Sequence, residues 1–158
     1  MKKRIAFVHN AMWEMYNFRG ELLQELKAKG YEITVICPPD EKNAHYFTDL
    51  GIKLLTVPMS RKGTNIKEDL QLVKNLFKVY KKEKFDLVFH YTIKPNIYGT
   101  LAAKLAGIKS IAITTGLGYV FLHNNITSLI AKFMYKFSLA FANEVWFLND
   151  DDMNIFLD

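Results

Sequence analysis

Short apolar runs alternate with helix-forming segments along the whole chain, and this alternation limits the possible folds most strongly. Each apolar run has the length of a buried strand, and the intervening segments repeat apolar residues at helical spacing. The connections are short, which favours parallel strands joined by crossover helices. The pattern predicts an α/β fold with a doubly wound, mainly parallel sheet of about six strands and helices on both faces. The predicted strands are Ile5–His9, Ile33–Cys37, Lys53–Val57, Leu87–His90, Ser110–Thr114 and Glu144–Leu148.

The predicted helices fill the intervals between these strands. Asn17 is placed to cap the first helix, which would run to about Lys29, because Asn is a favoured N-cap. Pro95 is placed at the start of a helix that ends before Gly107, as the preferences of Pro and Gly for helix ends indicate. The other predicted helices are Glu41–Leu50, Ile66–Lys82, Ile126–Ala142 and Asp150–Leu157.

Composition bounds the class of protein but does not choose a ligand. The 158 residues are enough for one domain with a core, and a hydrophobic content of 50% excludes disorder. The net charge of +5 is compatible with a phosphorylated ligand, nucleic acid or an anionic membrane surface. The single cysteine, Cys37, excludes a disulfide within the chain and is interpreted as a buried structural thiol. No apolar run approaches the roughly 20 residues of a membrane span.

Several common α/β sites are excluded by their missing motifs. The stretch after the first strand, His9–Asn17, has no Gly-x-Gly-x-x-Gly pattern, and no phosphate-binding Gly-x-x-x-x-Gly-Lys loop is present. Thr56–Pro58 offers no phosphorylatable Asp of the response-regulator type. No Cys/His cluster has metal-ligand spacing, and no Ser lies in a Gly-x-Ser-x-Gly turn.

Polar, basic and aromatic residues gather instead where the predicted strands end. The stretches concerned are Met12–Arg19, Ser60–Asn65, His90–Gly99 and Thr114–Phe121. Ligands of open α/β sheets bind at the carboxyl ends of the strands, so two such loops on adjacent strands predict a site. Cations beside helix starts suit a phosphate or diphosphate, aromatic faces suit a sugar ring or a lipid stem, and Asn and Thr suit hydroxyls.

Four motifs in colinear order carry a family resemblance. Tyr16-Asn-Phe-Arg19, Ser60-Arg-Lys-Gly-Thr-Asn65, Thr92-Ile-Lys-Pro-Asn-Ile-Tyr-Gly99 and Thr115-Gly-Leu-Gly-Tyr-Val-Phe121 resemble the N-terminal, Rossmann-like domain of family 4 glycosyltransferases, which have the two-domain GT-B fold. The resemblance is closer to the branch that extends lipid-linked oligosaccharides for capsule, O-antigen or glycoprotein assembly. It covers essentially the whole chain.

The resemblance implies a division of labour between two domains. The N-terminal domain would hold the acceptor, and a C-terminal domain would hold the nucleotide-sugar and a pair of glutamates. The reaction would retain anomeric configuration, with no metal and no cofactor beyond the nucleotide-sugar. Residues 1–158 would form a single domain, without the donor domain, and would be inactive alone. Sugar transfer by the 158-residue chain would contradict this expectation.

The same resemblance supplies candidate site residues. A donor-facing loop would comprise Gly116, Leu117, Gly118 and Tyr119, although a purely structural turn is the alternative. Thr114–Gly118 lacks the His that many members carry in a Thr-x-His-Gly context, so no catalytic base is assigned; His90 is the nearest candidate, against a structural hydrogen-bonding role. The acceptor-binding candidates, each with a solvated or core-packing alternative, are Tyr16, Asn17, Arg19, Arg61, Lys62, Lys94, Asn96 and Tyr98.

The leading hypothesis is therefore the acceptor-binding domain of a retaining transferase, located in the cytoplasm and peripherally on the inner face of the cell membrane. The apolar stripe of Ile126–Ala142 is either core-facing or rests on an anionic bilayer beside Lys132 and Lys136. The alternative is a non-catalytic or membrane-recruiting subunit of a split transferase. A nucleic-acid partner is not expected, because the cations are not interleaved with aromatics on one sheet face.

Overall fold

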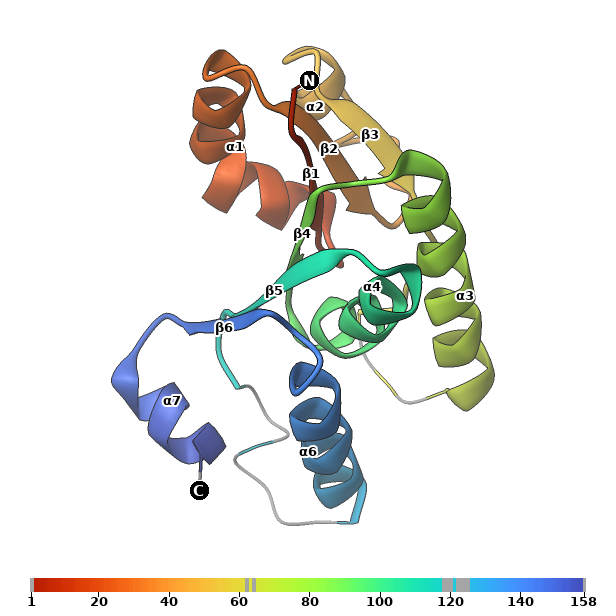
Figure 1. Cartoon of the computed structure of the whole chain (residues 1–158), viewed down its shortest axis with the longest axis vertical. Coiled ribbons are helices and arrows are strands. Elements are labelled where there is room, and N and C mark those ends of the chain that lie inside the picture. The colour runs from red at the N-terminus through yellow and green to blue at the C-terminus, as the bar shows by residue number, and fades with distance from the viewer. Residues whose placement is uncertain (1, 62, 64, 118–120, 122–125, 158) are drawn as a thin grey trace.

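A six-stranded, all-parallel sheet organises the chain. The computed structural model describes residues 2–61, 63, 65–117, 121 and 126–157. The strand order is β3-β2-β1-β4-β5-β6, with every neighbouring pair parallel (Figure 1). This confirms the predicted Rossmann-like, doubly wound sheet. The strands are β1 Arg4–Val8, β2 Glu32–Cys37, β3 Lys53–Thr56, β4 Leu87–Tyr91, β5 Lys109–Thr114 and β6 Glu144–Phe147.

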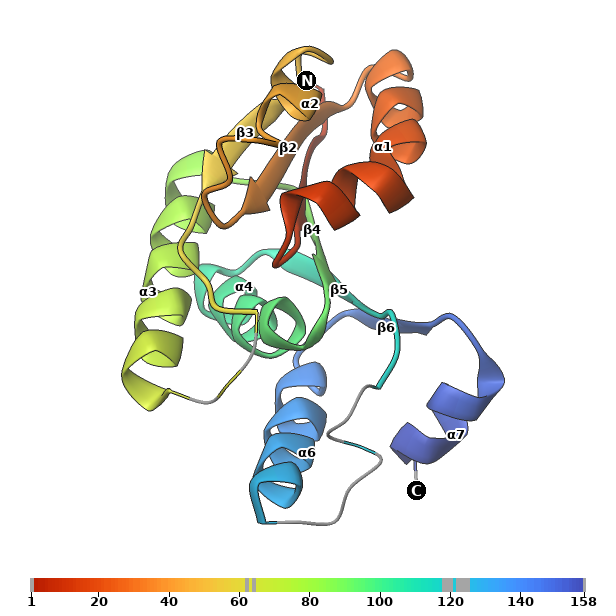
Figure 2. The same ribbon diagram turned by 180° about the vertical axis from the view of Figure 1, so that it is seen from behind.

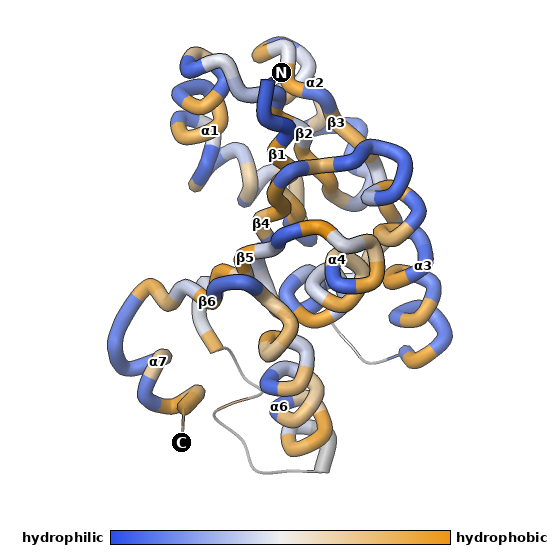
Figure 3. The backbone as a smooth tube through the Cα atoms, in the orientation of Figure 1, coloured by the Kyte–Doolittle hydropathy of each residue, from blue (hydrophilic) through white to orange (hydrophobic). Residues whose placement is uncertain are grey.

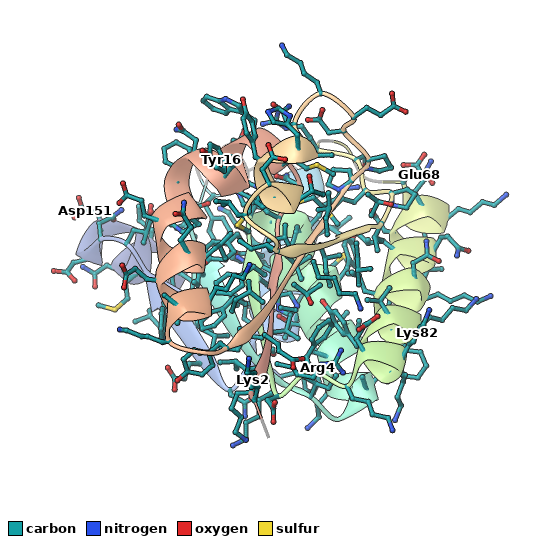
Figure 4. The ribbon with its side chains drawn as sticks, turned by 90° about the horizontal axis from the view of Figure 1, so that it is seen from above. Lys2, Arg4, Tyr16, Glu68, Lys82 and Asp151 are labelled. Atoms are coloured by element: carbon teal, nitrogen blue, oxygen red, sulfur yellow. The ribbon has the colours of Figure 1, made fainter. Side chains whose placement is uncertain are left out.

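Helices cover the two faces of the sheet in separate groups. Helices α1 (Met12–Ala28) and α2 (His45–Thr48) pack on one face, where Met15, Leu23 and Phe47 are buried. The other face carries α3, α4 and α6, seen from two sides in Figures 1 and 2. Figure 4 shows α1, with Tyr16, and α3 on opposite sides of the sheet. The remaining elements are α3 Ile66–Glu83, the π-helical turn η1 Pro95–Gly99, α4 Thr100–Ala106, α6 Ile126–Leu139 and α7 Asp150–Leu157.

The core is formed by the apolar strands and by the apolar faces of the helices that alternate with them in the sequence. Burial of apolar side chains is the main favourable term in folding, and the parallel strands are apolar on both faces. Figure 3 shows β1 and β4 largely in the hydrophobic colour. Phe7, Phe89 and Tyr91 stack across β1 and β4 on the α1 side. On the other side, Tyr80 of α3 is buried beside Phe85 and His90.

The first helix begins earlier than predicted. Helix α1 starts at Met12, after Ala11, so Asn17 lies inside it and does not cap it. Met12, Met15 and Leu23 are buried at helical spacing, and this stripe extends the helix toward β1. The segment Met12–Arg19 is therefore helical, and the prediction of a loop there was wrong.

Two other predicted helices are shorter than expected. Only His45–Thr48 is helical within the predicted Glu41–Leu50, because a turn precedes it in which the N–H of Asn43 donates to the carbonyl of Asp40. Helix α6 ends at Leu139 rather than Ala142. The predicted helix around Pro95 is present, although it begins two residues earlier, at Ile93, and Pro95–Gly99 is π-helical. Gly107 ends α4 with φ at +73°.

The described helices leave part of one sheet face uncovered. On the α1 side, α1 reaches as far as β4, while the described helices that follow β4 and β5 pack on the opposite face (Figures 1 and 2). A cavity of about 450 Å³ there is lined by apolar groups that include Phe7, Leu22, Phe89 and Trp146. Among the described residues, no helix is both long and apolar enough to cross a membrane.

Candidate functional site

The strand order reverses between β1 and β4, and a polar cavity lies at the carboxyl ends of these two strands. Such a reversal point opens a crevice in doubly wound sheets, and ligands bind there. The cavity measures about 310 Å³. Larger cavities lie elsewhere, among them one on the uncovered sheet face and one beside α3. The cavity at the reversal point combines acidic, basic and aromatic groups, which makes it the candidate site. Its lining residues are His9, Glu14, Phe18, Arg19, Tyr91, Thr115 and Leu148.

His9 gives this cavity a neutral hydrogen-bond donor. The imidazole is buried, and its Nδ1 accepts from the N–H of Ala11 at 3.0 Å, so the ring proton of the neutral form lies on Nε2. Burial, opposed by Glu14, lowers the pKa of His9 to about 4. Nε2 lies 3.9 Å from Oε2 of Glu14. Near pH 7, His9 therefore presents an uncharged N–H beside a carboxylate.

Helix α1 also brings a cation to the cavity. The guanidinium of Arg19 lies 5.2 Å from the ring centroid of Tyr91, within cation–π range. Its Nη1 donates to the carbonyl of Phe18 at 2.9 Å. Arg19 occupies the cavity because α1 begins at Met12, which places Glu14 and Arg19 in successive turns. Of the predicted acceptor-binding residues, Arg19 is one that the structure places in the cavity.

The segment after β3 is tied to the same site. Arg61 forms an ion pair with Glu14, which joins that segment to α1. The Arg61 side chain remains well exposed and can reach a ligand above the cavity. Lys62, its predicted neighbour in the site, lies outside the described residues.

The backbone at the strand ends is strained, as is common at functional sites. Thr92, directly after β4, has φ at +69°, which is unusual for a β-branched residue. Its Oγ1 and the Oδ1 of Asn10, which follows His9, are buried without a hydrogen-bond partner among the described residues. A buried polar group without a hydrogen-bond partner lowers stability. The presence of two such groups at this edge therefore favours a role for the edge in binding.

The stretch from Lys94 to Tyr98 faces the protein interior instead. Nζ of Lys94 donates to Oδ1 of Asp69 and to Oγ of Ser60, each at 2.7 Å. The hydroxyl of Tyr98 donates to the other carboxylate oxygen of Asp69 at 2.8 Å. Asn96 donates to the carbonyl of Ile113 and the hydroxyl of Tyr135, at 3.0 and 2.8 Å. The polar groups of these three predicted acceptor-binding residues form hydrogen bonds inside the domain, and the structure does not place them in the cavity.

His90 is likewise an interior group. The imidazole is fully buried, with Nε2 at 2.9 Å from the hydroxyl of Tyr80 and Nδ1 at 3.4 Å from that of Thr100. Burial lowers the pKa of His90 to about 3. A Cβ on Gly99 would lie 2.5 Å from Cδ2 of this ring, so the glycine of the motif permits close packing here. The geometry therefore favours the structural alternative for His90.

The other predicted residues are distributed around the site. Tyr16 stacks on Tyr46 at 4.2 Å, and Asn17 is exposed on α1, so neither lines the His9 cavity. Gly116 is exposed with φ at +130°, a conformation that favours glycine, whereas Leu117 is buried in the core. Gly118 and Tyr119 lie outside the described residues.

Sequence reasoning missed His9 as a site residue, and it indicated the stretches that contain Glu14, Tyr91 and Thr115 without naming these three as contacts. The available signal was positional, since His9 directly follows the first strand, where a doubly wound sheet reverses. Glu14 could be placed only once α1 was known to begin at Met12.

Comparison with known proteins gives the chain a family. A family model described as "Glycosyl transferase 4-like" matches residues 4–149. The N,N'-diacetylbacillosaminyl-diphospho-undecaprenol alpha-1,3-N-acetylgalactosaminyltransferase of Campylobacter jejuni is 32% identical over 94% of this chain and 41% of its own length. The UDP-Gal:alpha-D-GlcNAc-diphosphoundecaprenol alpha-1,3-galactosyltransferase of Escherichia coli is 25% identical over 79% of this chain and 32% of its own length. The chain thus spans less than half the length of these relatives.

Solved structures with low identity share the fold. A putative UDP-N-acetylglucosamine 2-epimerase from Listeria monocytogenes superposes with a TM-score of 0.71 at 14% identity, over 99% of this chain and 41% of that one. MurG from Acinetobacter baumannii superposes with a TM-score of 0.68 at 16% identity, over 94% of this chain and 42% of that one. These matches support the Rossmann-like architecture. Together with the family match over residues 4–149, they confirm the resemblance: the chain belongs to the glycosyl transferase 4-like family.

Proposed function

We propose that this chain is the acceptor-binding domain of a retaining glycosyltransferase. The full enzyme transfers a sugar from a nucleotide-sugar to a lipid-diphosphate-linked saccharide in bacterial surface polysaccharide or glycan assembly, including capsule and O-antigen. The observation that carries the proposal is the cavity of His9, Glu14, Arg19 and Thr115 at the strand reversal. The names of the two relatives, which both describe saccharides on diphospho-undecaprenol, supply the substrate class.

The chemistry of the cavity favours the sugar of such an acceptor. Glu14 accepts hydrogen bonds, while Nε2–H of His9, the guanidinium of Arg19 and the hydroxyl of Thr115 donate them. A sugar ring presents hydroxyls that both donate and accept, and its C–H face packs on an exposed aromatic ring such as Phe18. A diphosphate would be repelled by Glu14, so we place it on the exposed side of Arg61, away from the Glu14 carboxylate with which Arg61 pairs.

The donor half belongs to a second domain in this proposal. The chain spans 41% and 32% of the two relatives, which leaves room in chains of that length for a nucleotide-sugar domain. The partly exposed apolar surface around Phe89 and Trp146 is the kind of surface that further structure covers, because parallel sheets are buried on both faces. The 158-residue chain alone is then inactive, and sugar transfer by it would contradict the proposal.

Helix α6 supports a peripheral position on the inner face of the cell membrane. Its inner side is buried through Tyr135 and Leu139, while a second apolar stripe faces outward. Lys104 of α4 lies over the ring of Phe141 at 5.9 Å, which places a cation at the end of this stripe. An exposed apolar stripe with a lysine at its end suits an anionic bilayer, where a lipid-linked acceptor resides. The outward residues are Leu129, Ile130, Phe133 and Phe137 of α6 and Phe141 just after it.

Arg19 provides the direct test of acceptor binding. The probe is a short-chain polyprenyl diphosphate that carries N-acetylglucosamine, titrated into the chain by calorimetry. We expect Arg19→Ala to weaken binding about tenfold or more, because one charge-assisted contact contributes about 1.5–3 kcal/mol. Lys29→Ala, an exposed cation just beyond the carboxyl end of α1, should leave the affinity unchanged. Equal affinity for Arg19→Ala and the unmodified chain would remove Arg19 from the site.

A further inference from the structure

A second cavity opens at the same edge of the sheet, on the other side of β1. It measures about 560 Å³ and lies between the segments that follow β2 and β3 and the first half of α3. One wall is apolar and rigid, formed by Pro38, Pro39, Pro58, Met59 and Leu72. Polar groups line the rest of the cavity: Ser60, Gln71 and Asn75 are uncharged, and Lys67, Glu68 and Asp69 are charged. The proposed function assigns no role to this cavity.

The polar side carries hydrogen-bonding groups suited to hydroxyls. Nε2 of Gln71 donates to Oδ1 of Asn75 at 2.8 Å, one turn along α3. Among the described residues, this leaves the Gln71 oxygen as an acceptor and the Asn75 amide nitrogen as a donor. A ligand hydroxyl can donate to the first and accept from the second. The two amides are therefore already positioned as a pair.

Charged side chains in the cavity wall argue against an anionic ligand. Asp69 lies in the cavity wall but is buried, and it accepts from Lys94 and Tyr98 on its inner side. Glu68 accepts from the side-chain amide of Asn65. With Glu68 and Asp69 in the wall, a phosphate would meet two carboxylates, with Lys67 the cation that lines the cavity. The lining residues include no aromatic ring for a nucleobase. The ligand class that fits is neutral, apolar on one face and rich in hydroxyls.

The two cavities are neighbours. Ser60 lines the second cavity, and the next residue, Arg61, pairs with Glu14 of the first. The N–H of His9 donates to the carbonyl of Ile36 in β2 at 3.1 Å, and β2 ends one residue later, just before Pro38. Adjacent strands lie about 4.8 Å apart, so a ligand that extends along the sheet edge passes from one cavity to the other.

We propose that this second cavity binds a sugar ring, as a subsite for an additional unit of the glycan whose first unit occupies the His9 cavity. The pyranose packs its C–H face on the proline wall and its hydroxyls on Gln71 and Asn75. The inference rests on the proposed function for the His9 cavity, and it makes the acceptor an oligosaccharide, longer than the single-sugar acceptors in the names of the two relatives.

Nuclear magnetic resonance of the 158-residue chain tests the two cavities separately. The probes are methyl N-acetylglucosaminide and N,N'-diacetylchitobiose. We expect the disaccharide to shift amide signals near His9 and Thr115 and also those of Gln71 and Leu72. The double variant Gln71→Ala with Asn75→Ala should weaken disaccharide binding about tenfold, to the level of the monosaccharide. Lys78→Ala, exposed further along α3 and outside the cavity, is the matched control.

Each outcome separates the subsite from the proposed function. Shifts confined to the His9 cavity, with equal affinity for both probes, overturn the subsite and leave the proposed function standing. Shifts confined to the second cavity support the subsite and overturn the assignment of the His9 cavity. An absence of shifts at both cavities overturns the subsite and the proposed acceptor site together. Equal loss of binding in Lys78→Ala and in the double variant also overturns the subsite.

Discussion

His9 and His90 belong to neighbouring strand ends but have different surroundings. His9 follows β1 and reaches a cavity that contains Glu14 and Arg19. His90, within β4, is enclosed by Tyr80, Thr100 and the backbone of Gly99. The sequence alone presents both as single histidines after apolar runs. What distinguishes them is the direction of each side chain relative to the sheet, which residue type does not reveal.

Both imidazoles make the fold sensitive to mild acid. The pKa is about 4 for His9 and about 3 for His90, against 6.5 for the free side chain, and burial is the main cause. Below pH 6.5 the two histidines bind protons in the unfolded chain but stay neutral in the native state. Their contribution to the free energy of unfolding is therefore fully present above pH 6.5 and decreases as the pH falls below it. We expect the free energy of unfolding to decrease between pH 7 and 5 by on the order of 1 kcal/mol per pH unit for each histidine.

Urea denaturation at several pH values measures this slope. The pKa values of Glu83 and Asp86 are lowered by their partners Lys53 and Arg4, so these carboxylates lose their contribution only at lower pH. The window from pH 5 to 7 therefore isolates the histidines. His9→Gln should reduce the slope, because one of the two groups is removed. A free energy of unfolding that is constant over this window would contradict the buried neutral state of both rings.

Gly99 and Gly20 form a matched pair for testing close packing. A Cβ at Gly99 would lie 2.5 Å from the His90 ring, whereas at Gly20 its nearest neighbour is the Tyr16 ring at 3.4 Å. We expect Gly99→Ala to destabilise the chain by about 1–3 kcal/mol through overpacking. Gly20→Ala, inside α1, should be neutral or stabilising by up to about 1 kcal/mol, because Ala favours helix. Similar effects of the two substitutions on the midpoint of urea denaturation would show that the His90 contact is not tight.

At the scale of elements, a buried ion pair joins α3 to the segment after β4. Lys94 and Asp69 are 25 positions apart, and both are buried. Removal of one partner leaves an uncompensated charge in the interior. We therefore expect Lys94→Met to lower the free energy of unfolding by about 3–5 kcal/mol. Lys78→Met, on the exposed side of α3, should have little effect. A Lys94→Met chain as stable as the unmodified one would mean that Lys94 is solvated.

The outward stripe of α6 leads to a membrane prediction. Phe133 and Phe137 are 70% and 52% exposed, and their rings stack on each other. We expect the double variant Phe133→Ser with Phe137→Ser to lose most of its flotation with vesicles that contain phosphatidylglycerol, because the buried apolar area drives interfacial binding. Leu22→Ser, an exposed apolar position on α1, is the control. Flotation that is unchanged in the double variant, or independent of anionic lipid, would contradict this orientation.

The helices and strands could largely be predicted from the sequence. The hydrogen-bond partners of the side chains that they carry could not. Apolar periodicity located all six strands, and Pro95 and Gly107 marked the bounds of a helix. The start of α1 was missed, because Asn17 resembles a cap while Met12 and Met15 extend the buried stripe. In the candidate site, Arg19 could be predicted from its place near a strand end. Lys94, Asn96 and Tyr98 look equally available in the sequence, but their partners Asp69, Ile113 and Tyr135 lie 17 to 39 positions away.

At the scale of the whole molecule, distinct surfaces surround one sheet. The carboxyl ends of the strands hold the His9 cavity and the proline-walled cavity. Helix α6 presents an apolar stripe with Lys104 at its end, and the surface around Phe89 and Trp146 is a second apolar one. We propose that these surfaces serve the acceptor, the membrane and the donor-binding domain, respectively.

The most direct test compares acceptor and donor on the same chain. Amide signals of the 158-residue chain are followed while a polyprenyl-diphosphate-linked N-acetylglucosamine and, separately, a UDP-linked N-acetylhexosamine are added. We predict saturable shifts around His9, Glu14 and Arg19 with the lipid-linked sugar, and no binding of the nucleotide-sugar at this cavity up to millimolar concentration. Saturable binding of the nucleotide-sugar at the His9 cavity, with no response to the lipid-linked sugar, would contradict the acceptor-binding assignment.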